Sequence, residues 1–152
     1  MRYLATLSTI FILTIPGCAT NQTSTTKITD PRPCVKNLSS VGSFWSSRTF
    51  KTFQDFSGIS RSRAFNQLAP ALAGGGWTIS SSSKESGVIT AWAKPNYAEG
   101  ETESLNAVVR SKGTAGIRVE LTYIAPAMAI VPESTLNDQL CSILASVESA
   151  RK

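Results

Sequence analysis

The feature that most constrains the fold is a strict alternation of apolar and polar side chains over residues 117–123. The apolar positions of this segment are Ile117, Val119, Leu121 and Tyr123, and Leu105, Ala107 and Val109 alternate in the same way before it. Residues 112–116, with two glycines, join the two runs as a turn. Alternation with a period of two predicts antiparallel strands that bury one face and leave the other in water. Such a sheet needs a second layer on its apolar face.

Two segments with helical spacing can supply that layer. The first follows Ser60, a favourable N-cap residue, and runs through residue 73, where the glycines at 74–76 end it as a left-handed cap. Pro70 lies within this segment and predicts a kinked or shortened helix. The second covers 133–150, with an apolar stripe made of Leu136, Leu140, Ile143, Leu144 and Val147.

Shorter runs complete the predicted sheet. Residues 77–82 and 88–94 predict a hairpin, and residues 48–53 predict a short strand that ends before a turn near Ser57 and Gly58. Residues 37–47 form a weakly patterned lead-in. These elements predict an α+β two-layer sandwich, with an antiparallel sheet of about five strands and two helices on one face, in the order β-α-β-β-β-β-α.

The first residues predict a secretory signal rather than part of the fold. Arg2 precedes the apolar run Leu4–Ile15, which is shorter than the roughly 20 residues that span a bilayer. The following residues Ile15-Pro16-Gly17-Cys18 resemble the lipobox of bacterial lipoproteins. That resemblance implies a signal peptide over residues 1–17 and lipidation of the Cys18 sulfur. An ordinary signal peptide, cut near Ala19, is the alternative.

The resemblance also divides the chain into parts. Residues 18–33 are polar, rich in Thr and end in two prolines, so we expect a lipidated flexible tether that spans about 20 Å as a coil. Residues 34–152 are expected to form a single α+β domain. Ala19 stands where many lipoproteins retained at the inner membrane carry Asp. The implied address is the bacterial cell envelope, at the outer membrane and facing the periplasm if the host is Gram-negative.

The three cysteines are consistent with this division. Lipidation of Cys18 leaves Cys34 and Cys141, and the envelope is an oxidising compartment where such a pair tends to form a disulfide. This bridge would join the start of the domain to its last helix. Two unrelated thiols are the alternative.

The composition argues against most catalytic chemistry. The chain has 152 residues, 15 basic and 10 acidic, and no histidine, the commonest general base and metal ligand. Ala73–Trp77 lacks the lysine and the strand-to-helix order of a phosphate-binding loop. We therefore expect no catalytic residues, no metal and no cofactor. The basic residues are scattered, and an envelope address makes a nucleic acid an unsuitable partner.

Several apolar side chains are candidates for partner contact. They are Trp45, Trp92, Tyr97, Met128 and Ile130, the last two from the apolar segment 125–131. This segment can form an edge strand, a loop packed beneath the helix or an exposed patch, and the last arrangement would mark a partner site. The sequence leaves the choice open.

The domain resembles small envelope lipoproteins of the helix-grip kind, such as the BamC subunit of the outer-membrane β-barrel assembly machinery. The resemblance is carried by the element order and by the runs 48–50, 76–79 and 87–90. It implies a binding or scaffold role and transfers no functional residue.

Two functions follow from these expectations. The first is a lipid-anchored, non-catalytic envelope domain that binds a protein or acts as a scaffold at the membrane. The alternative is a binder of a small molecule, lipid or glycan in a cleft between sheet and helices, lined by Val119, Leu121, Leu140 and Leu144. The oligomeric state is left open.

Overall fold

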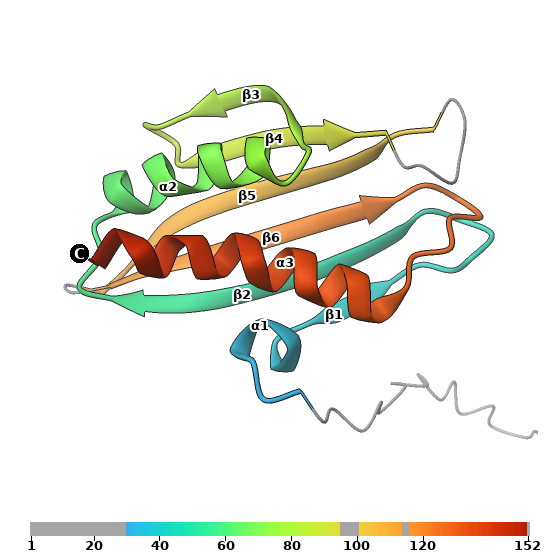
Figure 1. Ribbon diagram of the computed structural model, residues 1–152, viewed down its shortest axis with the longest axis horizontal. Helices are drawn as coiled ribbons and strands as arrows, with labels where there is room; N and C mark the ends of the chain where they lie inside the picture. The colour runs from blue at the N-terminus through green and yellow to red at the C-terminus, as the bar shows by residue number, and fades with distance from the viewer. Residues whose placement is uncertain (1–29, 95–100, 114–115, 152) are drawn as a thin grey trace, which may run out of the picture.

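A computed structural model describes residues 30–94, 101–113 and 116–151. It contains one six-stranded antiparallel sheet in the order β1-β2-β6-β5-β4-β3. Helices α2 and α3 lie side by side on one face of this sheet (Figure 1). The elements are α1 (Pro33–Lys36), β1 (Ser39–Val41), β2 (Arg48–Ser57), α2 (Arg61–Gly74), β3 (Thr78–Ser83), β4 (Val88–Ala93), β5 (Glu103–Lys112), β6 (Gly116–Ala125), α3 (Glu133–Glu148) and a 3-10 turn (Ser149–Arg151). The predicted two-layer α+β fold is confirmed.

The sheet has one strand more than predicted, because β1 pairs with the start of β2. All three residues of β1 are exposed, so this strand has no buried alternation that its sequence could display. The short helix α1 was not predicted either. Both elements lie in or just before the weakly patterned lead-in at residues 37–47.

Strand β2 extends four residues beyond the predicted end at residue 53, through Ser57. Its phenylalanines are spaced by three, which obscures the period of two. Phe50 and Phe56 are buried on the helix side, whereas Phe53 faces the other way under the guanidinium of Arg118, 4.0 Å from the ring centre. Thr52 takes the intervening buried position, and its hydroxyl donates a 2.5 Å hydrogen bond to the Cys34 carbonyl.

Both predicted ends of α2 are confirmed. The Ser60 hydroxyl accepts a hydrogen bond from the Arg63 amide at 3.3 Å. At the other end Gly76 has φ +86°, and the Trp77 amide donates to the Leu72 carbonyl at 3.1 Å. This is a Schellman ending, in which glycine adopts the left-handed conformation without a Cβ clash. Pro70 does not end the helix, which continues to Gly74.

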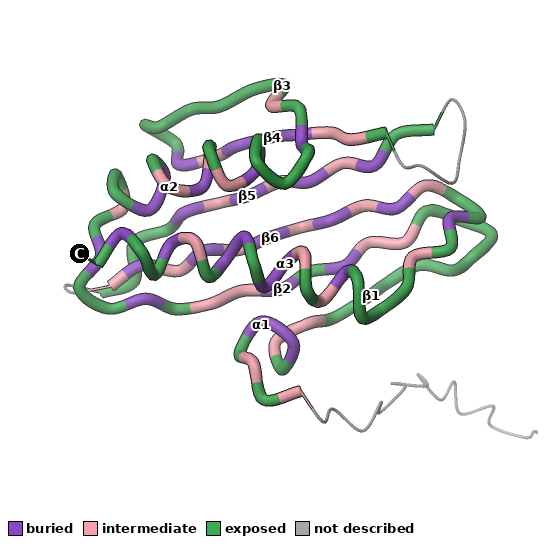
Figure 2. Tube along the Cα trace, viewed as in Figure 1, coloured by how far each residue is buried: buried purple, intermediate pink, exposed green. Residues whose placement is uncertain are grey.

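The core fills the space between the helices and the sheet. The predicted apolar stripe of α3 is buried in full, as are the predicted inward positions of β5 and β6 (Figure 2). Tyr123 is buried within it, packed edge-on against Trp77 and tilted against Phe50. The alternation seen in the sequence therefore corresponds to one covered face and one face without a described helix.

Candidate functional site

The start of the described chain is fastened to the middle of α3. Cys34 and Cys141 form the predicted disulfide, with Cα atoms 5.5 Å apart and a sequence separation of 107 residues. The side-chain amide of Asn37 donates a further hydrogen bond, from Nδ2 to the Phe53 carbonyl at 2.9 Å. Together with the Thr52 bond to Cys34, these contacts hold α1 between α3 and β2. The bridge predicted from the cysteine count is confirmed.

An ion-pair cluster extends this attachment one step towards the N-terminus. Arg32 donates to Asp30 at 2.6 Å and to Asp138 of α3 at 2.8 Å. Hydrogen bonds from Arg32 lower the pKa of the Asp30 carboxyl. Residues 30–33, which the sequence places in the tether, are thus held against the first turns of α3. Cys18 and residues 1–29 lie outside the described residues, so the lipidation site stays a prediction.

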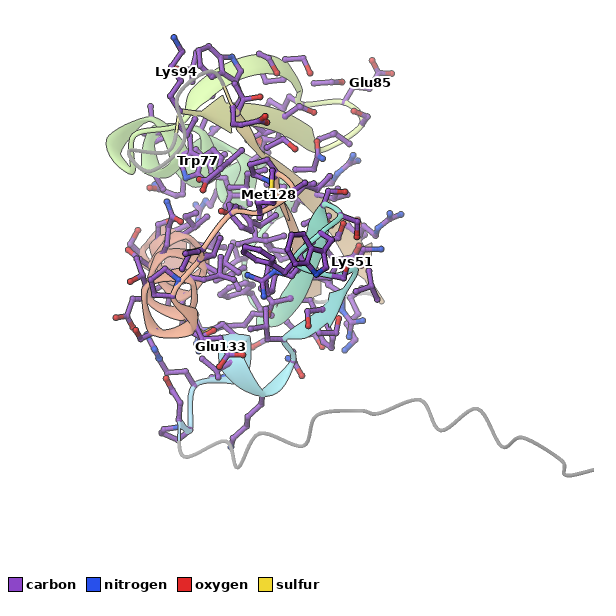
Figure 3. The ribbon with its side chains drawn as sticks, turned by 90° about the vertical axis from the view of Figure 1, so that its right-hand side faces the viewer. Lys51, Trp77, Glu85, Lys94, Met128 and Glu133 are labelled. Carbon is purple, nitrogen blue, oxygen red and sulfur yellow. A yellow bond between two sulfur atoms is a disulfide. The ribbon has the colours of Figure 1, made fainter. Side chains whose placement is uncertain are left out.

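One end of the molecule carries an unusual set of exposed apolar side chains. Within the described ranges, the exposed large hydrophobic residues are Val41 (65%), Phe44 (42%), Trp45 (80%), Met128 (63%) and Ile130 (72%). They come from two loops, 42–47 with the adjoining end of β1, and 126–132 between β6 and α3. We call this set the apolar end; Figure 3 views the molecule from this side, with Met128 near the centre.

The two loops of the apolar end are joined to each other. The Met128 amide donates a 2.7 Å hydrogen bond to the Phe44 carbonyl, and the Phe44 and Trp45 rings stack edge-on at 5.2 Å. Met128 has φ +61°, a left-handed conformation that costs energy for a side chain with a Cβ. Between the exposed Met128 and Ile130, Ala129 turns inward and is buried. After Ala125, the last residue of β6, the segment 126–131 is thus a loop with two side chains held outward.

A second surface lies on the side of the sheet opposite α2 and α3. It carries five half-buried apolar side chains on four strands, Phe53 of β2, Val88 and Trp92 of β4, Val108 of β5 and Ile124 of β6. We call this surface the helix-free face; in Figure 3 the two long helices lie together on the other side of the strands. Trp92 shares this face with Val88 and Thr90 of the same strand, and the face is not the core.

Strand pairing places the two surfaces next to each other. Val41 pairs with Thr49, which pairs with Ile124, and that row continues through Ser104 to Trp92. Four strand spacings separate Val41 from Trp92, about 19 Å. Of the candidate contact residues, Trp45, Met128 and Ile130 form one cluster, and Trp92 lies at the same end of the sheet. Tyr97 lies outside the described residues.

Two members of the apolar end, Val41 and Phe44, were not among the predicted contacts. Val41 is isolated between serines and a glycine, and Phe44 adjoins Trp45. Apolar residues within a polar, glycine-containing segment have no alternating partners with which to form a buried face. That isolation is the signal by which the sequence could have indicated them.

The opposite end of the sheet is charged and paired. Asp55 bonds to Arg118 at 2.7 Å and also to Lys112, and Arg110 contacts Glu120 at 3.3 Å. Hydrogen bonds from Arg118 and Lys112 hold the pKa of the Asp55 carboxyl far below its usual range. The Asp55 carboxylate is therefore ionised near neutral pH and paired with the side chains of Arg118 and Lys112. Its role is structural rather than that of an acid or base.

The proposed cleft between sheet and helices is occupied by its own side chains. Val119, Leu121, Leu140 and Leu144 are 0–2% exposed and pack in the shared core. An open depression of about 200 Å³ lies instead on the helix-free face beside β1, lined by residues that include Phe53, Glu120 and Thr122. Ligand pockets usually enclose about 300–1,000 Å³. The volume of this depression is below that range, and the depression is open to solvent.

The part of the chain that the structure describes offers neither a metal centre nor a membrane span. In residues 30–94, 101–113 and 116–151, no three His, Cys, Asp or Glu side chains are grouped so that they could hold a metal ion. No helix in these ranges has both the length and the hydropathy needed to cross a bilayer.

Comparison with known proteins bears on the fold alone. No family model and no curated protein matches the sequence. Among solved structures, a conserved protein of unknown function from Enterococcus faecalis, EF2215, is similar with a TM-score of 0.50 and 8% identity, over 76% of this chain and 77% of that one. Two further solved structures are less similar. TTHA0849 from Thermus thermophilus has a TM-score of 0.36 and 14% identity, over 68% of this chain and 96% of that one. Ara h 8.0201 has a TM-score of 0.35 and 14% identity, over 68% of this chain and 99% of that one.

Proposed function

We propose that the protein is a lipid-anchored, non-catalytic domain of the bacterial cell envelope that binds an envelope protein through the helix-free face. The lipid is attached at Cys18, and with Ala19 following it the anchor lies in the outer membrane of a Gram-negative host, with the domain in the periplasm. The observation that carries the binding role is the set of five half-buried apolar side chains on the helix-free face.

The chemistry of this face supports a protein as the partner. The apolar side chains are interspersed with polar ones, such as Thr90 and Asn106, which are joined by a 2.9 Å hydrogen bond. A broad, mixed surface of this kind resembles a protein–protein interface, which is no more apolar overall than the rest of a protein surface but is enriched in aromatic residues. A small ligand is better served by a concave, enclosing pocket. Trp92 is the natural anchor of the contact, because tryptophans dominate interface energetics.

The proposal is tested by site-specific crosslinking in the intact envelope. A photoreactive residue at Thr122, in the middle of the helix-free face, should capture one envelope protein from its native membrane. The same residue at Asn66, exposed on α2, is the matched control and should not capture it.

Two further variants complete this experiment. Trp92→Glu should abolish the crosslink from position 122, because a charge would be buried in the contact, and Cys18→Ala should reduce it by releasing the protein from the membrane. Equal capture from positions 122 and 66, or none from either, would reject the helix-free face as the site. Mass spectrometry of the mature protein tests the lipid on Cys18 separately.

A further inference from the structure

We propose that the apolar end inserts into the lipid bilayer that holds the anchor, so that the domain stands upright on the membrane and presents its helix-free face sideways. This inference rests on the lipid at Cys18 proposed above. The observations behind it, the two joined loops and the position at which the described chain begins, differ from those that support partner binding at the helix-free face.

The described chain begins against the first half of α3, nearer to the apolar end than to the charged end. Arg32 bonds to Asp138, which lies five residues into α3 from Glu133 and therefore about 7.5 Å along its axis. Glu133 directly follows the loop that carries Met128 and Ile130. The disulfide between Cys34 and Cys141 keeps this start from moving away along α3. The connection to the anchor therefore leaves the molecule nearer to the apolar end than to the charged end.

The chain between the anchor and this point is short. Residues 19–29 separate Cys18 from Asp30. Eleven residues span at most about 40 Å when extended and about 18 Å as a flexible coil. A tether of that length holds the nearest end of the domain at the bilayer surface at a high effective concentration. The end so held is the one with the exposed apolar side chains.

The composition of the apolar end suits a bilayer. Val41, Phe44, Met128 and Ile130 have no charge, and Trp45, its most exposed member, is of the type enriched at the membrane interface. Backbone polar groups must be satisfied before they enter an apolar phase, and the bond from the Met128 amide to the Phe44 carbonyl satisfies one pair. The neighbouring charges Arg48, Lys94 and Glu133 are of both signs and would lie at headgroup level.

Insertion would also set the orientation of the other surface. The strands run along the long axis of the molecule, from the apolar end to the charged end (Figure 1). With the apolar end in the membrane, the helix-free face stands roughly perpendicular to the bilayer. A protein embedded in the same membrane, or attached to it, can then approach that face from the side.

The test uses the lipidated full-length protein in vesicles of phosphatidylethanolamine and phosphatidylglycerol with brominated acyl chains. Bromine quenches only tryptophans at acyl-chain depth. Trp92 lies in the same strand row as Val41, so the assay is run in a Trp92→Phe background. We expect strong quenching there that disappears when Trp45→Phe is added, because the remaining Trp77 is buried in the core. The paired substitution Met128→Ser with Ile130→Ser should reduce the quenching several-fold. Val88→Ser, far along β4 from the apolar end, is the matched control and should leave it unchanged.

The outcomes separate this inference from the proposed function. Mass spectrometry that shows lipid on Cys18, together with Trp45 emission insensitive to brominated lipid, overturns insertion and leaves the anchor intact. Trp45 that becomes shielded only when envelope proteins are added back overturns it in favour of a protein at this end. A mature protein without lipid on Cys18 rejects the proposed anchor itself and, with it, this inference.

Discussion

The two ends of the sheet differ in the side chains that they expose. At the charged end, Asp55, Lys112 and Arg118 form ion pairs, and the surface is complete in water. At the apolar end, five large side chains face outward in two joined loops, and one residue adopts an unfavourable backbone conformation. A contiguous exposed apolar patch usually marks an interaction site, and strained backbone conformations cluster at functional sites. The domain is therefore asymmetric along its long axis, with a charged end suited to water and an apolar end suited to a contact.

The largest expected effect comes from breaking the disulfide that joins the start of the described chain to α3. Cys34→Ser with Cys141→Ser opens a loop of 107 residues, which should lower the free energy of unfolding by about 4–5 kcal/mol in the chain-entropy model. Denaturant titration measures this loss, and wild-type protein in reductant should reproduce it. A titration that superimposes on the oxidised wild type would mean that the bridge does not constrain the fold.

The next test compares two aliphatic side chains with opposite exposure. Leu144→Ala should lower the free energy of unfolding by about 2–5 kcal/mol, because it leaves a cavity in the core. Ile130→Ala should change it by less than about 0.5 kcal/mol, because the side chain packs on little. Thermal and urea unfolding of both variants check the pair. Similar losses for the two would show that the apolar end is part of the core.

The charged end is tested by its pH dependence. The pKa of Asp55 is lowered in the folded state by Arg118 and Lys112. Its contribution is therefore complete above the unfolded value near 3.8 and is lost as the pH falls below it. Asp55→Asn should remove about 1 kcal/mol at pH 7, given the partly exposed side chains, and less at pH 3. Equal losses at both pH values would contradict an electrostatic role for Asp55.

The smallest effect should have opposite signs for stability and binding. Met128→Gly relieves the left-handed conformation at φ +61° and should raise the free energy of unfolding by about 0.5–1 kcal/mol. The same change removes an exposed apolar side chain and should weaken attachment of the apolar end to membranes. Unfolding titrations and bromolipid quenching measure the two effects. A loss of stability would show that Met128 makes favourable contacts that outweigh its strain.

Much of the fold could be predicted because its signals are local. Ser60, the glycines at 74–76 and the stripe of α3 define helix ends and faces within a few residues. The alternation of apolar and polar residues in β5 and β6 indicates which face of that hairpin is buried. The short strand β1 carried no such signal, since its residues are exposed on both faces. The phenylalanines of β2 hid the true length of that strand, because Phe53 packs under Arg118 on the outer face.

The candidate surfaces were predictable only in part. Trp45, Trp92, Met128 and Ile130 were recognisable as apolar residues in need of explanation. Their grouping depends on the contact between the loops at 42–47 and 126–132, which are about eighty residues apart in the chain. Phe53 gave no indication in the sequence that it faces away from the helices, whereas Val108 lies between the inward positions Ala107 and Val109, so the alternation already placed it on the outer face.

By itself, the sequence determined the two-layer architecture and the apolar faces of its helices, because these follow from local periodicity. It predicted the bridge between Cys34 and Cys141 only through the lipobox resemblance that assigns Cys18 to lipid, and the structure decided between that bridge and two unrelated thiols. Only the tertiary structure decided which apolar side chains stay outside. Ala129 is buried while its neighbours Met128 and Ile130 are exposed, a distinction set by the path of one loop over the end of the core. Exposure depends on what packs nearby, and residues distant in sequence supply that packing.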